Sequence, residues 1–397
     1  MRFLLPALLA VPIMLSAQQQ ATEWSAATAA MDTYVASDQI VGSALVLIED
    51  GKIVSEHYTG FQDRNNRVPA DRNTIWHWGS ITKTLTAVAA MQVNRGYLFG
   101  AFEPPPYAPP STQPRAFLDQ AITSLVPETR RIHSDFGSMD QVTIRMLMSH
   151  SSGLQNGTWP WTRGEAWEPF EPTEWDQLVA MMPYMKLAFA PGTRYSYSNP
   201  GFVYIARAIE HLTGDPWQGR IYKMLFMPLG MTASYFGITP PYLLGQRSQN
   251  FTITDSGVMN RGLDFDPGIT IPNGGWNAPV TDLARWIGFL AGSTDRTTQA
   301  RYDALLPHEV IEEMWQPVVR VDADEEMGLS FFIRHQGGRK LVGHTGTQAN
   351  FRSFFWLDPV THRAVLGVVN TSSDIDGNAS DARYRGVMAA ARGVLGS

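Results

Sequence analysis

Residues 76–96 read WHWGSITKTLTAVAAMQVNRG, and this stretch carries both a structural and a chemical signal. After Ser80 the apolar residues recur at helical spacing until Gly96 supplies a stop, which predicts a helix over 81–95. Lys83 lies one turn into that helix, on the same face as Ser80, so its amine can reach the serine hydroxyl. Two interpretations follow from the residues alone: a nucleophile with its base, and an N-cap serine followed by a solvated lysine.

A catalytic serine–lysine pair has definite physical requirements. The serine hydroxyl needs a base within hydrogen-bonding reach, and a lysine amine becomes a base only where burial or nearby positive charge lowers its pKa. The N-terminus of a helix disfavours the ammonium ion and can bind an oxyanion. Lysine is also scarce in this chain, which makes a chance match less expected; the lysines are Lys52, Lys83, Lys186, Lys223 and Lys340.

Two further polar stretches carry candidate site residues. In YSNPG, Tyr197 and Asn199 lie in a turn just before a predicted helix. A tyrosine hydroxyl can relay or accept a proton when cations depress its pKa, and an asparagine amide can orient a lysine and a substrate carbonyl. An ordinary Asn-Pro turn is the alternative. In GHTGT, His344, Thr345 and Gly346 lie on or at the end of a strand, where glycine marks the close approach of a backbone or a ligand.

The composition is that of a compact soluble protein. The 397 residues can bury a large core in one domain or two, and 44% of them are hydrophobic while 17% are charged. A formal net charge of -6 argues against a nucleic-acid partner. The chain has no cysteine, so it has neither disulfides nor a thiol nucleophile. HEVIEE at His308 lacks the second histidine of a zinc motif, and neither a metal nor a cofactor is predicted.

The first residues, MRFLLPALLAVPIMLSAQQQ, have the form of a secretory signal peptide: one arginine, an apolar run, then small and polar residues. We predict cleavage after Ala17 and export to a periplasm or out of the cell. A membrane anchor is the alternative. The apolar run from Phe3 to Leu15 is shorter than the roughly 20 residues of a spanning helix, so stable membrane insertion is not expected after cleavage.

Strand signals lie at both ends of the chain, with helical signals between them. A hairpin is predicted near 42–58 around Asp50-Gly51, and strand runs joined by Gly-Gly and Asp-Pro turns occupy 327–370. SDARYRGVMAAARGVLG closes the chain as a helix. We therefore predict an α/β plus all-α fold, with an antiparallel sheet built from both chain ends, flanking helices and an inserted helical domain. Helices are predicted at 141–149, 173–182, 200–213 and 280–292.

The predicted boundaries follow from these signals. A signal peptide covers 1–17, an α/β domain combines 18–100 with 265–397, and a mainly helical domain covers 101–264. A proline-rich insertion occupies 100–116 at the start of the helical domain, because its composition suits neither a helix nor a sheet interior.

The combination of stretches resembles the serine hydrolases with the fold of penicillin-binding proteins and class C β-lactamases, the β-lactamase/transpeptidase-like fold. GSITK looks like the SxxK motif of that family, YSN looks like its YxN motif, and HTG stands where many members carry KTG. VTIRMLMSHSSGL, GGWNAPVTDLARWIGFL and FRSFFWLDP are also similar. The resemblance extends from about Trp24 to the end of the chain, and the HTG form is the variant found in family VIII-type carboxylesterases.

The resemblance implies a role for each matched residue. Ser80 would be the acylated nucleophile and Lys83 the base that activates it. Tyr197 would share proton transfer, chiefly in activating the deacylating water, and Asn199 would position the substrate. The backbone N–H groups of Ser80 and Thr347 would form the oxyanion hole, in which each donor contributes on the order of 3 kcal/mol.

The candidate wall of the substrate site consists of His344, Thr345, Gly346 and Thr347. It departs from the family pattern at its first residue, His344. A lysine there is a permanent cation that helps to hold a carboxylate, whereas a histidine titrates near pH 6.5. This favours esters or amides without a strict carboxylate over β-lactams. Trp159, Trp161 and Trp167 either line the cleft for a hydrophobic acyl group or pack an irregular loop.

The sequence thus predicts a secreted serine hydrolase that acts on a small ester, amide or peptide, most readily as a carboxylesterase. A D-alanyl or D-amino-acid peptidase and a weak β-lactamase are alternatives within the same chemistry. A catalytically dead binding or regulatory protein on this scaffold is an alternative of another class. A Ser-His-Asp hydrolase would need a GxSxG elbow, which the chain lacks, so His77 is interpreted as structural.

Overall fold

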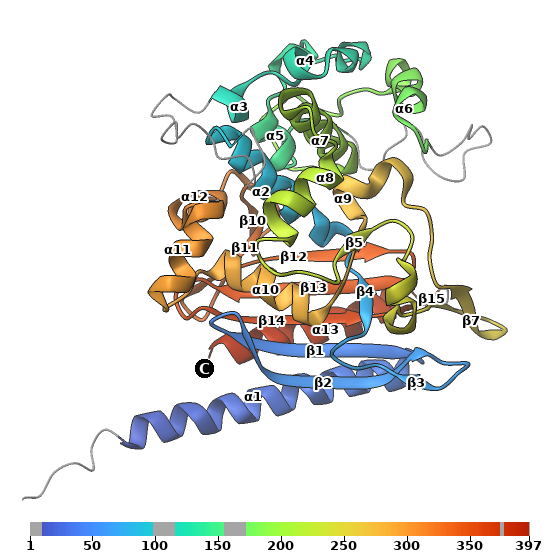
Figure 1. Cartoon of the computed structure of the whole chain (residues 1–397), viewed down its shortest axis with the longest axis vertical. Helices are drawn as coiled ribbons and strands as arrows, with labels where there is room; N and C mark the ends of the chain where they lie inside the picture. Colours follow the sequence, from blue (N-terminus) through green and yellow to red (C-terminus); the bar gives the residue numbers. More distant parts are fainter. Residues whose placement is uncertain (1–9, 98–115, 155–171, 374–376, 397) are drawn as a thin grey trace, which may run out of the picture.

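A long antiparallel sheet forms the centre of the computed structural model, which describes residues 10–97, 116–154, 172–373 and 377–396 (Figure 1). Within these residues its strand order is β3-β2-β1-β14-β13-β12-β11-β10-β9, so strands from the two ends of the chain lie side by side. The strands are β1 Gly42–Glu49, β2 Lys52–Asp63, β3 Val68–Pro69, β9 Val319–Arg320, β10 Glu325–Met327, β11 Phe332–Gln336, β12 Arg339–Gln348, β13 Phe351–Asp358 and β14 Arg363–Val369.

Tight turns fix the register of the two hairpins that the sequence predicted. Asp50 and Gly51, with φ of 47° and 73°, join β1 to β2 and place Glu49 opposite Lys52. Gly337 and Gly338, with φ of 60° and 79°, join β11 to β12 in the same way. Positive φ at both central positions matches the twist of the flanking strands, which explains the Asp-Gly and Gly-Gly pairs.

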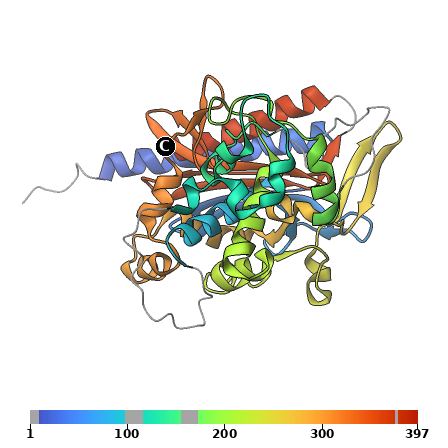
Figure 2. The ribbon, with the colours of Figure 1, turned by 90° about the horizontal axis from the view of Figure 1, so that it is seen from above.

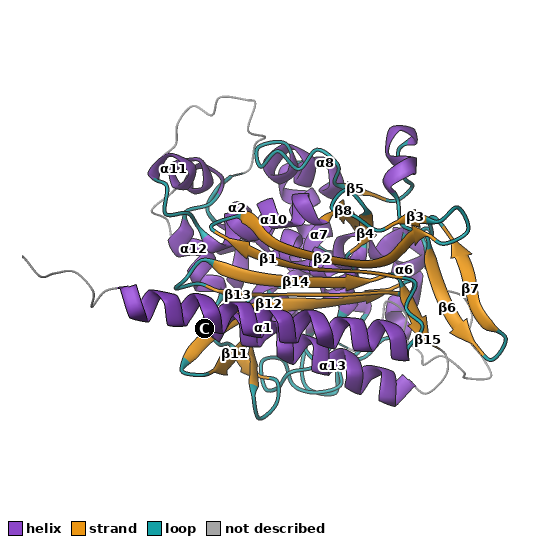
Figure 3. Ribbon diagram, turned by 90° about the horizontal axis from the view of Figure 1, so that it is seen from below, coloured by secondary structure: helices purple, strands orange, loops and turns teal. Residues whose placement is uncertain are grey.

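Helices cover both faces of the sheet (Figure 3). α1 Ala10–Ser37 and α13 Gly377–Gly393 lie on one face, and α2 Thr82–Asn94 and α10 Val280–Ala291 lie on the other. Alternate residues of β1 serve the two cores: Leu45 packs with the α1 and α13 side, while Val46 packs with the α2 and α10 side. Because both faces are buried, β1 reads as a nearly continuous apolar run.

The remaining helices gather mostly on one side of the molecule, above β11 and β12 in Figure 1, and Figure 2 shows this layer from above. The helices are α3 Ala116–Asp119, α4 Ile122–Leu125, α5 Ile144–Met148, α6 Trp175–Met181, α7 Asn199–Thr213, α8 Trp217–Ile221, α9 Ile271–Gly274, α11 Arg296–Leu305 and α12 His308–Met314. Short 3₁₀ or π turns are η1 Gly79–Ile81, η2 Pro127–Arg131, η3 Met139–Gln141, η4 Met182–Tyr184, η5 Tyr222–Phe226, η6 Pro241–Gln246, η7 Gly268–Thr270 and η8 Val394–Gly396.

Two small three-stranded sheets accompany the long one. β4 Ile75–His77 pairs with β8 Trp276–Pro279, which in turn pairs with β5 Tyr235–Phe236. β6 Asn250–Thr254 and β7 Gly257–Gly262 form a hairpin, and β6 runs parallel to β15 Thr371–Ser373. β4 leads straight into η1 and α2, so this pairing sets the position of the serine–lysine stretch.

The fold class predicted from the sequence is confirmed: a mixed α/β structure with an antiparallel sheet from both chain ends and helices between them. The division into two domains stays a prediction, as does the signal peptide. The proline-rich insertion at 100–116 and the three tryptophans of 159–167 lie outside the described residues, apart from Ala116 at the start of α3. Among the described residues, no helix combines the length and apolar character needed to cross a membrane.

Candidate active site

Ser80 and Lys83 meet where β4 runs through η1 into α2. The Nζ atom of Lys83 is 3.0 Å from Oγ of Ser80 and 2.7 Å from the backbone oxygen of Asn273. Ser80 is half-buried, whereas Lys83 is fully buried. Lys83 is therefore not a solvated helix residue. Its amine can donate to Asn273 while its lone pair faces the serine hydroxyl.

Burial sets the protonation state of Lys83. Removal from water lowers the pKa of its amine well below the usual value for lysine. The surroundings are aromatic, since Nζ lies 4.9 Å from the centre of the Tyr197 ring and 5.6 Å from that of Phe202. The partial positive charge at the N-terminus of α2 disfavours the ammonium ion further. A neutral amine can accept the Ser80 proton, which is the state that a general base requires.

Tyr197 lies beside this pair, immediately before α7. Its hydroxyl is hydrogen-bonded to Ser80, and burial raises the pKa of the phenol above its usual value. The sequence suggested that cations would depress this pKa. In the structure, burial has the largest effect on the pKa of this phenol. Burial also keeps the nearby Lys83 amine neutral, so this amine supplies no positive charge that would lower the phenol pKa. Tyr197 is therefore a protonated phenol that can donate or relay a proton, and it is not a phenolate base.

Asn199 and Asn273 close the site on the α7 side. The side-chain amide of Asn273 donates to Oδ1 of Asn199 at 3.4 Å. α9, which carries Asn273, is fastened to α2 by a 2.6 Å hydrogen bond from the Thr86 hydroxyl to the Pro272 oxygen. Sequence motifs did not indicate Asn273, because its contact with Lys83 uses a backbone oxygen that any residue could supply. Its position just before GGWNAPV is the one available signal.

Strand β12 forms the opposite wall and passes directly beside residues 78–80. A Cβ atom added at Gly346 would overlap the backbone oxygen of Trp78, and one added at Gly79 would lie 3.0 Å from the backbone nitrogen of Thr347. Gly79 also has a φ of 52°. Glycine at both positions therefore allows the Thr347 nitrogen to approach the Ser80 segment, where the predicted oxyanion hole requires it.

Replacing Gly346 by alanine is expected to lower kcat/KM for an ester by about 10²-fold, because the added methyl group pushes β12 away from Trp78 and displaces the Thr347 donor. Stopped-flow acylation rates would measure the effect, with circular dichroism to check the fold. Gly386→Ala on α13 is the matched control, since an added Cβ there meets open space. Unchanged acylation in a folded Gly346→Ala protein would contradict the close approach of the strand.

His344 is fully buried in β12, behind the surface of the site. Its Nδ1–H donates to the Thr345 oxygen at 2.5 Å, and its ring lies 5.3 Å from that of Phe332 and 6.4 Å from that of Tyr197. Burial is the main cause that lowers the pKa of His344 to about 3. The titration near pH 6.5 that the sequence suggested is corrected: this histidine is neutral at neutral pH. Thr347 is exposed and Thr345 is half-buried.

His77 has the structural environment that the sequence predicted for it. Its Nδ1 is 2.9 Å from Oδ1 of Asn277, and its Nε2 is 3.2 Å from Oε1 of Gln348, the residue after Thr347. The side chain is buried, and its pKa falls to about 4 chiefly because of that burial. His77 thus joins β4, β8 and β12 around the site without approaching Ser80 as a base.

Lowering the pH from 7 to 4 is expected to reduce the free energy of unfolding by several kcal/mol. Burial lowers the pKa values of His77 and His344 to about 4 and about 3, whereas an unfolded histidine titrates near 6.5. Between these values the unfolded chain binds protons that the folded chain does not, so stability is lost as the pH falls. For His77 alone the loss at pH 4 is about 3 kcal/mol.

Urea unfolding at pH 7, 6, 5 and 4 would measure this loss. His77→Gln cannot take up the proton and should flatten the pH dependence. His335→Gln on β11 is the control, because His335 is exposed and removing it should leave the slope unchanged. A wild-type stability that stays constant down to pH 4 would contradict the buried neutral histidines.

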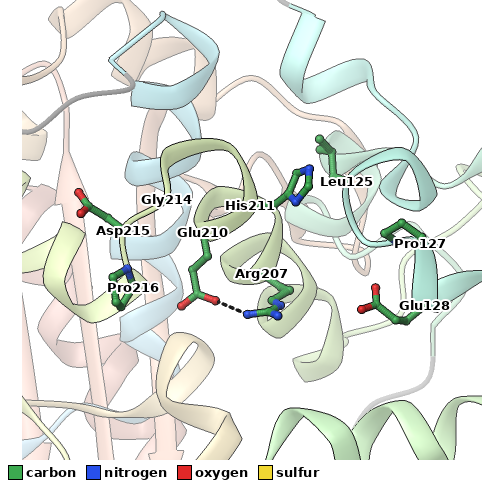
Figure 4. Close-up of a pocket in the computed structure, with 9 residues that line it drawn as sticks. All are labelled: Leu125, Pro127, Glu128, Arg207, Glu210, His211, Gly214, Asp215 and Pro216. Carbon is green, nitrogen blue, oxygen red and sulfur yellow. Dashed lines mark hydrogen bonds and ion pairs between the residues drawn. The ribbon is translucent and has the colours of Figure 1, made fainter.

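A pocket of about 450 Å³ lies at the opposite end of α7 from Tyr197 (Figure 4). Arg207 and Glu210 form an ion pair of 3.2 Å along its wall, and Asp215 pairs with Lys223 at 3.0 Å. None of the residues around Ser80 lines it, so it takes no part in the site. Among the described residues, no group of three or more histidine and acidic side chains is arranged to hold a metal ion.

The family model described as Beta-lactamase matches residues 27–390. The chain belongs to the beta-lactamase family. This family's fold is also found by structural similarity: a class C beta-lactamase superimposes with a TM-score of 0.70 over 95% of this chain and 97% of that protein, at 17% identity. The predicted resemblance is therefore confirmed for the fold and for the family.

Two curated relatives in this family have named activities. Esterase EstB of Burkholderia gladioli is 27% identical over 213 residues, which is 51% of this chain and 49% of the esterase. The D-aminopeptidase of Brucella anthropi is 24% identical over 349 residues, which is 87% of this chain and 58% of that enzyme. The chain thus spans about half to three fifths of the length of these two relatives. The family is one of serine hydrolases that includes esterases and peptidases.

Proposed function

We propose that this chain is a serine hydrolase that cleaves small esters through an acyl-enzyme on Ser80. The observation that carries the proposal is the 3.0 Å contact between the buried amine of Lys83 and the Ser80 hydroxyl. The hydrogen bond between Tyr197 and Ser80 and the approach of the Thr347 nitrogen support it. The esterase and the D-aminopeptidase among the relatives support hydrolysis of an acyl bond.

In the acylation step, Oγ of Ser80 attacks the ester carbonyl carbon while its proton passes to Nζ of Lys83. The carbonyl π electrons move to the oxygen, and the oxyanion accepts hydrogen bonds from the backbone N–H groups of Ser80 and Thr347. Collapse re-forms the carbonyl and breaks the bond to the alcohol oxygen. That oxygen takes the proton from Lys83, directly or through the Tyr197 hydroxyl, and the alcohol departs.

Deacylation reverses these roles with water as the nucleophile. As the water oxygen attacks the acyl carbon, its proton passes through the Tyr197 hydroxyl to the neutral Lys83 amine. The second tetrahedral intermediate collapses by breaking the bond to Oγ, which recovers a proton from Lys83. The carboxylic acid leaves, and Ser80 is again a hydroxyl. A phenol with a raised pKa suits this relay, because it exchanges one proton for another and never carries the charge itself.

The charges around β12 favour esters over carboxylate-bearing substrates. Lys340 donates to the Trp315 oxygen at 3.1 Å, and Arg339 pairs with Asp358 at 2.8 Å. Arg352, on β13, is bonded to Asp381, and His344 is neutral at neutral pH. Within the described parts of β12 and β13, each basic side chain is therefore either engaged with another partner or uncharged. A substrate carboxylate would find no free cation on these strands.

We expect the affinity for a carboxylate-bearing ester to stay constant between pH 8 and pH 5, because His344 remains neutral throughout that range. KM values for a monoester of a dicarboxylic acid and for the corresponding methyl diester would measure this, at each pH. The ratio of the two KM values should not change. A ratio that shifts in favour of the carboxylate-bearing ester near pH 6.5 would show that a group in the site becomes a cation in that pH range.

A D-amino-acid peptidase is the second candidate function. The observation in its favour is the extent of the match, since the D-aminopeptidase aligns over 87% of this chain and the esterase over 51%. Amide hydrolysis uses the same acyl-enzyme, with the amine nitrogen taking the proton from Lys83. It demands more of the proton donor, because an amine leaves less readily than an alcohol unless it is protonated.

We further propose that the protein is exported, with the first 17 residues removed. α1 runs from Ala10 to Ser37, but its residues from Ala27 onward form the buried contact with the sheet, including Met31 and Tyr34. Cleavage after Ala17 would leave that contact intact. Mass spectrometry of the protein recovered from the periplasm or the medium would test the cleavage site, and an uncut N-terminus in the cytoplasm would contradict it.

A substrate panel tests the proposed reaction. It would contain short-chain p-nitrophenyl esters, D-alanyl p-nitroanilide and a chromogenic cephalosporin, with intact-mass detection of the acyl adduct. We expect the esters to turn over fastest and the adduct to map to Ser80. D-Alanyl amide turnover exceeding ester turnover would favour the peptidase. The absence of any adduct or turnover would favour a binding protein on this scaffold.

A further inference from the structure

One buried histidine holds the turn that carries Tyr197. His150 lies just after α5, in the stretch MSHSSGL, and is fully buried with a φ of 55°. Its ring stacks on that of Tyr197, with 4.2 Å between the ring centres and 28° between the planes. Among the described residues, no hydrogen bond joins His150 to Ser80. The proposed mechanism therefore gives His150 no role.

Besides the bond from its backbone N–H to the Leu147 oxygen, His150 makes hydrogen bonds with the two residues that flank Tyr197. Its backbone oxygen accepts the N–H of Ser196 at 2.8 Å, and its Nδ1 accepts the N–H of Ser198 at 3.0 Å. A backbone N–H can only donate, so Nδ1 must carry the lone pair, and the ring proton lies on Nε2. One residue therefore fixes the backbone before Tyr197, the backbone after it, and the plane of its ring.

This arrangement determines where the phenol oxygen lies. Ser198 is also the N-cap of α7, accepting the N–H of Gly201 at 3.4 Å. The hydrogen bond from Ser198 to His150 thus ties the start of α7 to the end of α5. Without it, the turn could rotate about that cap and carry the Tyr197 hydroxyl away from Ser80. Misplacement of a catalytic group by about 1 Å can cost about 10²-fold in rate.

We propose that His150 is a positioning residue for the proton relay, which holds the Tyr197 hydroxyl against Ser80 through the Nδ1 acceptor and the stacked ring. It takes no proton from the substrate or from water. The residue sets the rate of proton transfer rather than the strength of substrate binding. This role rests on the proposed acyl-enzyme function of Ser80. It explains in structural terms why the Tyr197 hydroxyl lies close enough to Ser80 to relay protons.

Two substitutions separate the acceptor from the ring. His150→Phe keeps an aromatic ring for stacking and removes the Nδ1 acceptor. His150→Asn removes the ring, supplies Oδ1 close to the place of Nδ1, and suits the positive φ. His362→Phe is the matched control, because His362 also has a positive φ, of 54°, but lies in the turn between β13 and β14.

With p-nitrophenyl butyrate we expect His150→Phe to lower kcat by about 10²-fold while KM stays within about threefold of the wild-type value. His150→Asn should recover kcat to within about tenfold of wild type, and His362→Phe should keep it. Accumulation of the Ser80 acyl adduct in His150→Phe, detected by intact mass, would place the defect in deacylation. A folded His150→Phe protein with wild-type kcat would overturn the proposal, as would equal losses in the Phe and Asn variants.

Two results distinguish failure of the proposed function from failure of the positioning role alone. If wild-type protein forms no adduct on Ser80, the proposed function fails and this role fails with it. If wild type forms the adduct and His150→Phe deacylates normally, only the positioning role fails. Should the Phe variant not fold, NMR of ¹⁵N-histidine-labelled wild type decides, with His150 assigned by difference from His150→Asn. A bare Nδ1 with a protonated Nε2 supports the proposal, and a protonated Nδ1 overturns it.

Discussion

Replacement of Ser80 by alanine is expected to lower the hydrolysis of p-nitrophenyl esters by about 10⁴-fold or more. Neither neighbour can take over as the nucleophile, because Lys83 is buried and Tyr197 is held as a phenol. Residual turnover would come from the oxyanion donors alone. Steady-state assays with intact-mass analysis would measure the loss of both turnover and adduct.

Ser138→Ala is the matched control for this substitution. Ser138 also stands at the start of a 3₁₀ turn, where its Oγ accepts the N–H of Asp140 at 3.1 Å. If Ser80 were only a helix-start residue, the two substitutions would have similar small effects on stability and none on turnover. Turnover that survives in Ser80→Ala would sink the acyl-enzyme mechanism.

Replacement of Lys83 by methionine is expected to lower kcat/KM by about 10³-fold without destabilising the fold. Methionine fills a similar volume, and burying its apolar side chain requires no desolvation of an amine. The Asn273 oxygen loses a donor, which costs about 1 kcal/mol. Removing the buried amine offsets this loss, because in the wild type the pKa of Lys83 is far lower in the folded chain than in the unfolded one.

The same pKa difference gives the sign of the stability change with pH. Between the folded and the unfolded pKa of Lys83, the unfolded chain binds a proton that the folded chain lacks, so wild-type stability rises with pH toward 10.5. Lys83→Met should lack that increase in urea unfolding at pH 7 and pH 9. Lys340→Met, which removes an amine that donates to the Trp315 oxygen, is the control for activity. Wild-type kcat/KM in a folded Lys83→Met protein would contradict the role of base.

The serine–lysine contact could be predicted because it is local. Residues three apart at a helix start share a face in any fold, so Ser80 and Lys83 needed no knowledge of distant packing. Tyr197 and Thr347 could be assigned to the same site as Ser80 and Lys83 only through the family resemblance. Their approach to that pair depends on how α7 and β12 pack against α2. The Asp50-Gly51 and Gly337-Gly338 turns were equally local, which explains why the hairpins were predicted correctly.

What the sequence could not give was the electrostatics of the site. A histidine in HTG suggests titration near pH 6.5, but the pKa of His344 depends on the burial of its ring, which appears only in the folded chain. The same holds for the phenol of Tyr197. His150 was inside a stretch that looked familiar, yet its stacking and its Nδ1 contact have no pattern in the sequence.

The pairing of β1 with β14 has a consequence for the order in which the protein becomes active. Ser43 lies opposite Val369, so the central sheet is incomplete until strands far apart in the chain have met. The proposed nucleophile and base, Ser80 and Lys83, are synthesised early as a local pair, whereas Thr347 emerges from the ribosome late. In the proposed mechanism, a nascent chain thus holds Ser80 before the Thr347 donor of the oxyanion hole is present. We therefore expect the proposed activity to appear only after β12 has docked beside the Ser80 segment.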